Sequence, residues 1–142
     1  MPPTCYPIAL VLDGKRCLVV GGGEIADGKL DALLLAGAVV TVVSPEVRSR
    51  IAALAADGQI TLHLRSYQTS DLDDTYLAIA ATDDRPTNAR MVTEARAAGI
   101  LTQAVDDIPG GAQITMLYTF EVEGGEKPVC VAETLARVYA AS

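Results

Sequence analysis

The chain has 142 residues, of which 50% are hydrophobic and 4% aromatic, and its formal net charge is −7. One domain with one core fits this length, and the abundance of small aliphatic residues suits a sheet packed between helices. The basic residues are scattered, which argues against nucleic-acid binding, and no apolar run reaches the roughly 18 residues of a membrane-spanning helix, so we expect a cytoplasmic protein without either partner.

Strand-like and helix-like segments alternate along the first part of the chain. The predicted strands are, in order, 16–20, 39–44, 60–64, 76–84 and 100–105. Apolar residues recur at helical spacing over 24–36, 46–57 and 86–98, and a glycine follows each of these stretches. Residues 66–75 are polar and rich in turn formers. This alternation predicts an α/β fold, a Rossmann-like, doubly wound parallel sheet of about five strands.

Residues 108–142 have a different character. They contain two alternating segments joined through Gly124-Gly125, which is typical of a β-hairpin. An isolated hairpin is marginally stable in water, so we expect this segment to pair with another chain. The predicted organisation is therefore a nucleotide-binding domain of residues 1–107 and a β-rich tail, 108–142, that serves dimerisation or another interaction.

A glycine-rich loop, Gly21-Gly22-Gly23, lies between the first predicted strand and the first predicted helix. The pattern Gly21-x-Gly23-x-x-Ala26 matches the dinucleotide fingerprint, in which the glycines permit a tight turn and a close approach of the pyrophosphate. The phosphates would then lie at the helix N-terminus, whose N–H groups and dipole favour an anion. The alternative is a tight turn that binds nothing.

The second predicted strand ends in Ser44-Pro45-Glu46, where an acid that binds the adenosine ribose is usual. Ser44 is able to hydrogen-bond a ribose hydroxyl, and Glu46 is close enough in sequence to reach it. Arg48 and Arg50 follow, either on a solvated helix face or in contact with the 2′-phosphate of NADP. We prefer NAD as the cofactor.

The fourth predicted strand ends in Thr82-Asp83-Asp84. Carboxyl ends of parallel strands line one crevice, so Thr82 and Asp83 are candidates for cofactor contact. Alternatively, Asp83 and Asp84 cap the helix that follows.

Three segments together resemble a known family: CLVVGGGEIADGK, LLLAGAVVTVVSPE and YLAIAATDDRPTNARMVTEARAAGILTQAVDD. Over about residues 6–107 the chain is similar to the N-terminal domain of siroheme synthase and to precorrin-2 dehydrogenases. The resemblance implies NAD-dependent oxidation of the tetrapyrrole precorrin-2 to sirohydrochlorin, with insertion of ferrous iron in some members. It also implies that Glu24 and Ile25 border the pyrophosphate, that Pro45 and Glu46 border the ribose, and that Asp106 is the functional carboxylate.

Asp106 has a chemical rationale of its own. A dehydrogenation sends a hydride to the nicotinamide and a proton to a base, so a carboxylate beside the crevice is useful. Asp106 directly follows the fifth predicted strand. The alternative is that Asp106 and Asp107 cap a turn before Pro109.

Members of the family continue with a dimerisation and substrate-covering segment that contains an SxGGxSP-like stretch, and this chain lacks that stretch. Two functions therefore remain open. One is the dehydrogenase, expected as a homodimer. The other is a non-catalytic nucleotide-sensing module that acts with a partner protein.

Overall fold

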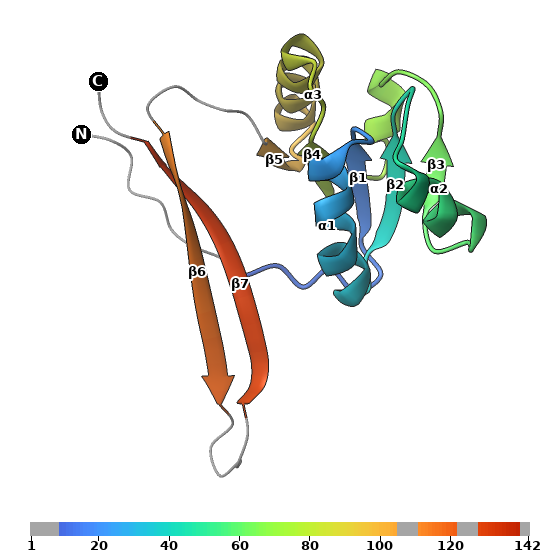
Figure 1. Ribbon diagram of the computed structural model, residues 1–142. Coiled ribbons are helices and arrows are strands. Elements are labelled where there is room, and N and C mark those ends of the chain that lie inside the picture. The colour runs from blue at the N-terminus through green and yellow to red at the C-terminus, as the bar shows by residue number, and fades with distance from the viewer. Residues whose placement is uncertain (1–8, 105–110, 122–127, 140–142) are drawn as a thin grey trace. The chain divides into compact units, whose positions relative to one another are not determined.

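The computed structural model describes residues 9–104 and, as backbone, residues 111–121 and 128–139 (Figure 1). The chain divides into two units, and the first is Ile8–Asp106. Its elements are, in chain order, β1 (Arg16–Val20), α1 (Glu24–Leu35), β2 (Val39–Val43), α2 (Ser49–Ala56), β3 (Thr61–His63), the 3-10 helix η1 (Thr69–Leu72), β4 (Leu77–Ala80), α3 (Arg85–Ala97) and β5 (Leu101–Ala104).

Five parallel strands form the sheet, in the order β3-β2-β1-β4-β5. In the central strand β1, Val19 pairs with Val42 of β2 and with Ile79 of β4. The chain builds outwards from β1 to β3 and then returns to the other side of β1, so the strand order reverses between β1 and β4. This confirms the predicted Rossmann-like fold. Sheets of this kind bind ligands outside the carboxyl ends of their strands, at the reversal.

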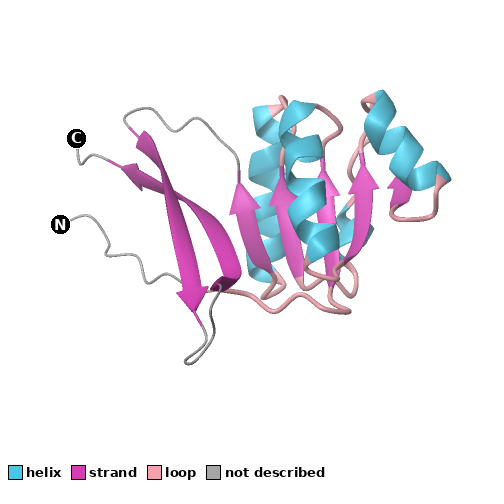
Figure 2. Cartoon of the chain, turned by 60° about the horizontal axis from the view of Figure 1, so that its bottom comes forward, coloured by secondary structure: helices cyan, strands magenta, loops and turns pink. Residues whose placement is uncertain are grey.

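Helices cover both faces of the sheet (Figure 2). On β1, Val19 belongs to the core cluster that contains Leu30 of α1, whereas Val20 belongs to the cluster that contains Met91 of α3. A strand that is buried on both faces is apolar at successive positions, since neither face needs polar residues. The run Arg16–Val20 could be predicted as a strand for this reason.

The second helix begins later than the sequence predicts. Spacing indicates a helix from Glu46, but α2 begins at Ser49. The Ser44 hydroxyl donates to the Glu46 carbonyl at 2.6 Å, and the Arg48 N–H donates to the Gly22 carbonyl at 2.9 Å. These two bonds hold residues 44–48 in a turn beside the glycine loop, so that this segment is not available for a helix.

The fourth strand is shorter than the predicted 76–84, because β4 ends at Ala80. The Ala81 N–H still donates to the Val20 carbonyl at 2.8 Å, but the Thr82 carbonyl accepts from Nδ2 of Asn88 at 2.9 Å. The chain therefore leaves the sheet at Thr82 and turns into α3.

The polar stretch after β3 contributes two core residues that the sequence does not reveal. Tyr67 is 5% exposed and Leu72 is 6% exposed, and both belong to the same core cluster as Val20 and Val43. Two apolar residues in a polar stretch show neither helical nor strand periodicity. The connection from β3 to β4 contains the short helix η1. Tyr67 and Leu72 of this connection pack into the core beside Val20 and Val43.

The second unit contains two antiparallel strands, β6 (Gly111–Glu121) and β7 (Pro128–Tyr139), with Ile114 opposite Ala136. They lie where the sequence predicts the strands of a hairpin. The predicted junction, Gly124-Gly125, lies outside the described residues. Among the helices that the structure describes, none is long and apolar enough to cross a membrane.

Candidate dinucleotide site

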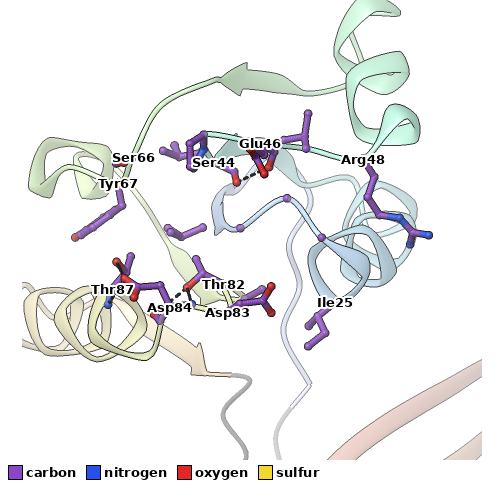
Figure 3. A pocket seen from close by; sticks show the side chains of 18 of the residues that line it. Ile25, Ser44, Glu46, Arg48, Ser66, Tyr67, Thr82, Asp83, Asp84 and Thr87 are labelled. Atoms are coloured by element: carbon purple, nitrogen blue, oxygen red, sulfur yellow. Dashed lines mark hydrogen bonds between the residues drawn. The ribbon is translucent and has the colours of Figure 1, made fainter.

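A cleft of about 800 Å³ opens at the carboxyl ends of β1, β2 and β4 (Figure 3). Small-molecule and cofactor sites have volumes of roughly 300–1,000 Å³. Every residue predicted to contact the cofactor lines this cleft: Gly21, Gly22, Gly23, Glu24, Ile25, Ser44, Pro45, Glu46, Thr82 and Asp83. The predicted base Asp106 lies outside the described residues.

The first two glycines of the loop are required by packing inside the protein. Gly21 has φ +133°, and a Cβ there would lie 2.3 Å from the carbonyl oxygen of Ala81. A Cβ on Gly22 would lie 2.1 Å from the carbonyl oxygen of Glu46. Neither contact is sterically acceptable, and the obstructing atoms are backbone atoms. Both positions therefore need glycine whether or not a ligand binds.

Gly23 has no such packing reason. Its φ of −90° and ψ of −160° suit any residue, and a Cβ there would meet no atom within 4 Å apart from its own helix and chain neighbours. It is the N-cap of α1, a position where Ser, Thr, Asp or Asn usually accepts from the first-turn N–H groups, and no side chain does so here. Open space and uncapped donors at the positive end of a helix fit the pyrophosphate of a dinucleotide.

The turn after β2 forms the second wall of the cleft. The Ser44 side chain is buried, and because its hydroxyl donates to the Glu46 carbonyl, its proton serves the turn. An oxygen lone pair of Ser44 is still able to accept from a ribose hydroxyl. The Glu46 residue is exposed, and its carboxylate is an acceptor suited to ribose hydroxyls.

The two arginines that follow this turn, of which Arg48 lines the cleft, are involved in ion pairs with α1. Arg50 pairs with Asp27 and Asp31, and these carboxylates raise the pKa of the Arg50 guanidinium. Nη1 of Arg48 lies 3.4 Å from Oδ2 of Asp27. The sequence leaves two roles open for these arginines, a place on a solvated helix face or a contact to a 2′-phosphate. Neither role involves an ion pair with α1.

The loop after β4 is fixed by a side chain that the sequence analysis does not single out. Asn88 of α3 is 1% exposed, and its Oδ1 accepts from the Thr82 N–H at 3.1 Å and from the Thr82 hydroxyl at 2.8 Å. Asp84 is the N-cap of α3 and accepts from the Thr87 N–H at 3.2 Å. Of the two predicted capping acids, Asp84 is therefore the cap, while Asp83 is exposed at the cleft.

The third wall includes Tyr67 and Arg90, which no local motif marks. The Tyr67 hydroxyl donates to Oε2 of Glu94 at 2.6 Å, and the guanidinium carbon of Arg90 lies 5.1 Å from the centre of the Tyr67 ring. Burial, and then the neighbouring Glu94 carboxylate, raise the pKa of Tyr67. Nε of Arg90 lies 3.1 Å from Oε1 of Glu94. These contacts fix a neutral phenol and a cation at the edge of the cleft.

A glycine-rich loop between a strand and a helix, at the point where a parallel sheet reverses its order, defines a dinucleotide-binding domain of the Rossmann type. The chain belongs to the family described as "Putative NAD(P)-binding", whose model matches residues 8–115. The predicted class of cofactor, a nicotinamide dinucleotide, is confirmed by this membership.

Curated relatives are siroheme synthases. The enzyme of Chromobacterium violaceum is 39% identical over 140 residues, which cover 94% of this chain and 30% of that protein. Siroheme synthase 1 of Aeromonas salmonicida is 45% identical over 130 residues, covering 87% and 28%. This chain thus spans about 30% of the length of these relatives. The predicted resemblance is confirmed, and a match to 94% of the chain extends beyond the predicted residues 6–107.

A solved structure gives a similar result. The protein described as "SirC, precorrin-2 dehydrogenase" matches with a TM-score of 0.63 and 26% sequence identity. The match covers 90% of this chain and 61% of that chain. The similarity therefore includes the fold over most of this chain.

Proposed function

We propose that this chain binds NAD in the cleft and oxidises precorrin-2 to sirohydrochlorin. The observation that carries the proposal is Gly23, an uncapped helix N-terminus with open space, in a chain similar to SirC and to siroheme synthases. Bound NAD would supply the acceptor for a hydride. The protein's contribution is then to bind, orient and take up a proton.

The cleft offers distinct groups to the parts of the dinucleotide. The first-turn N–H groups behind Gly23 would bind the pyrophosphate, with Glu24 and Ile25 at its border. Ser44, Pro45 and Glu46 would hold the adenosine ribose. Thr82 and Asp83 lie on the β4 side, and the hydrogen bonds between Thr82 and Asn88 keep their loop in place. We place the nicotinamide half on that side.

We propose Asp106 as the base. A dehydrogenation breaks two bonds to hydrogen in the substrate, and one hydrogen leaves as a hydride to the cofactor while the other leaves as a proton. In this proposal the Asp106 carboxylate takes the proton, and the substrate is left with a new double bond. Asp106 follows the last residue of β5 by two positions in the chain, and β5 is the neighbour of β4 in the sheet.

Anaerobic mixing of the full chain with NAD and precorrin-2 tests the activity. We expect the absorption spectrum of sirohydrochlorin to appear together with NADH absorbance, in equal amounts. Addition of ferrous iron afterwards tests the chelatase step that some relatives perform. If NAD binds and neither product nor NADH forms, the dehydrogenase proposal is wrong.

A nucleotide-sensing module is the second candidate. It is favoured by the absence of an SxGGxSP-like stretch from the 142 residues. Such a module would bind NAD without turnover and would co-purify with a larger partner.

We also propose a homodimer, formed through residues 108–142. Light scattering of the full chain checks this, and a monomer at micromolar concentration contradicts it.

A further inference from the structure

Two arginines at the start of α2 are drawn toward a buried carboxylate of α1. Asp27 has a side chain that is only 10% exposed, and it pairs with both Arg48 and Arg50. The side chains of Arg48 and Arg50 are 52% and 44% exposed. A carboxylate buried to this extent requires charged or hydrogen-bonding partners, because desolvation of an unpaired charge is costly. The arginines supply these partners.

This cluster borders the adenosine side of the cleft. Arg48 and Glu46 both line the cleft, and the Arg48 N–H donates to the Gly22 carbonyl at 2.9 Å. In Figure 3 the Arg48 side chain extends toward α1 and away from Ser44. The guanidinium is therefore directed to Asp27, although its backbone stands beside the predicted ribose position.

We propose that Asp27 determines cofactor preference by keeping Arg48 from a 2′-phosphate. The inference rests on the proposed binding of NAD in this cleft. NADP differs from NAD by one phosphate on the adenosine ribose, and sites that accept it use an arginine there. Here Arg48, which lines the cleft next to the proposed ribose position, is engaged by Asp27, and Glu46 adds a negative charge. The site then selects NAD even though two arginines lie close by.

The test is Asp27→Asn, with calorimetric titration of NAD and of NADP at fixed ionic strength. Asparagine keeps the shape but removes the charge that holds the arginines. We expect affinity for NADP to rise about 10-fold relative to NAD, which is the effect of one hydrogen bond to a charged group. The control is Asp31→Asn, which removes a carboxylate that pairs with Arg50 and whose side chain is 73% exposed. In Asp31→Asn the ratio of NADP affinity to NAD affinity should stay within about twofold of the wild-type ratio.

Arg48→Gln completes the design. In the wild-type background it should change NADP affinity by less than about twofold, whereas in the Asp27→Asn background it should remove the whole gain. Equal losses of NADP affinity in the two backgrounds would show that Arg48 is already available, and would overturn the inference. The inference would also be overturned if Asp27→Asn bound NAD as wild type does and its ratio of NADP affinity to NAD affinity were unchanged.

A third outcome concerns the proposed function. If the wild-type chain binds neither dinucleotide, it is the assignment of the cleft that fails, and the preference falls with it. Should Asp27→Asn not fold, Asp27→Ala provides the same charge removal with a residue of higher helix propensity. Its NADP to NAD ratio is read by the same criteria.

Discussion

Substitution of Gly23 by Asp separates binding from folding. The backbone of Gly23 suits an L-residue and an added Cβ meets open space, so the fold should accept the change. Aspartate is also a preferred N-cap, better than glycine by a few tenths of a kcal/mol. Its carboxylate would accept from the first-turn N–H groups of α1. We expect the free energy of unfolding to be unchanged or slightly higher.

Binding of NAD should be lost for the same reasons. The new carboxylate occupies the space for the pyrophosphate, repels it and takes its donors. Each hydrogen bond to a charged group contributes about 1.5–3 kcal/mol, so loss of two such bonds costs at least about 3 kcal/mol. This corresponds to a decrease in affinity of about 100-fold or more.

Calorimetric titration with NAD and chemical denaturation of the same preparation measure the two effects. Gly28→Asp is the matched control, because Gly28 lies five residues further along the chain in α1, also has open space at its Cβ position and is outside the lining of the cleft. It introduces the same charge and should leave NAD affinity within about twofold. Wild-type affinity in Gly23→Asp would refute the placement of the pyrophosphate.

Three further changes test other parts of the site. Asn88→Ala should lower the free energy of unfolding by about 1–3 kcal/mol in urea, because it leaves the partly buried N–H and carbonyl of Thr82 without these hydrogen bonds, and an unchanged midpoint contradicts this. The hydrogen bond from the Tyr67 hydroxyl is the main cause of the lowered pKa of Glu94. Tyr67→Phe should therefore destabilise the protein more at pH 7 than at pH 3, where Glu94 is protonated in the unfolded chain. An equal loss of unfolding free energy at both pH values would contradict this. Asp106→Asn should reduce turnover about 10²- to 10⁴-fold with NAD affinity retained, and Asp107→Asn should be milder; loss of stability and NAD affinity in both variants would indicate turn caps.

The sheet and the glycine loop could be predicted because their signals are local. A strand covered on both faces is apolar at successive positions, as β1 is over 17–20, and the loop Gly21–Gly23 stands out between this run and a segment with helical spacing. The positions of Ser44 and Thr82 at the cleft follow from topology alone, since parallel strands end at one edge. These features need no knowledge of which residues meet in space.

Other features depend on contacts between distant segments, and the sequence does not show them. From the sequence alone, Asn88 is an ordinary polar residue of a predicted helix, and only the structure shows its hydrogen bonds to the Thr82 loop. Tyr67 is one aromatic residue in a polar stretch, and only the tertiary structure makes it part of the core. The partner of Arg48 is Asp27, on another helix, so its role could not be read from the spacing of charges.

The position of β1 at the centre of the sheet has a consequence for folding during synthesis. One edge of β1 pairs with β2, and the other edge pairs with β4, where Cys17 lies opposite Leu77. In the chain, β4 comes only after both β2 and β3. Until β4 leaves the ribosome, that edge presents unpaired backbone groups on which another chain can assemble. The glycine loop is incomplete over the same interval, because Gly21 packs on the backbone of Ala81. A nascent chain thus completes the candidate cofactor cleft only when β4 has paired with β1, and under the proposed function NAD would stabilise the finished sheet but not its precursors.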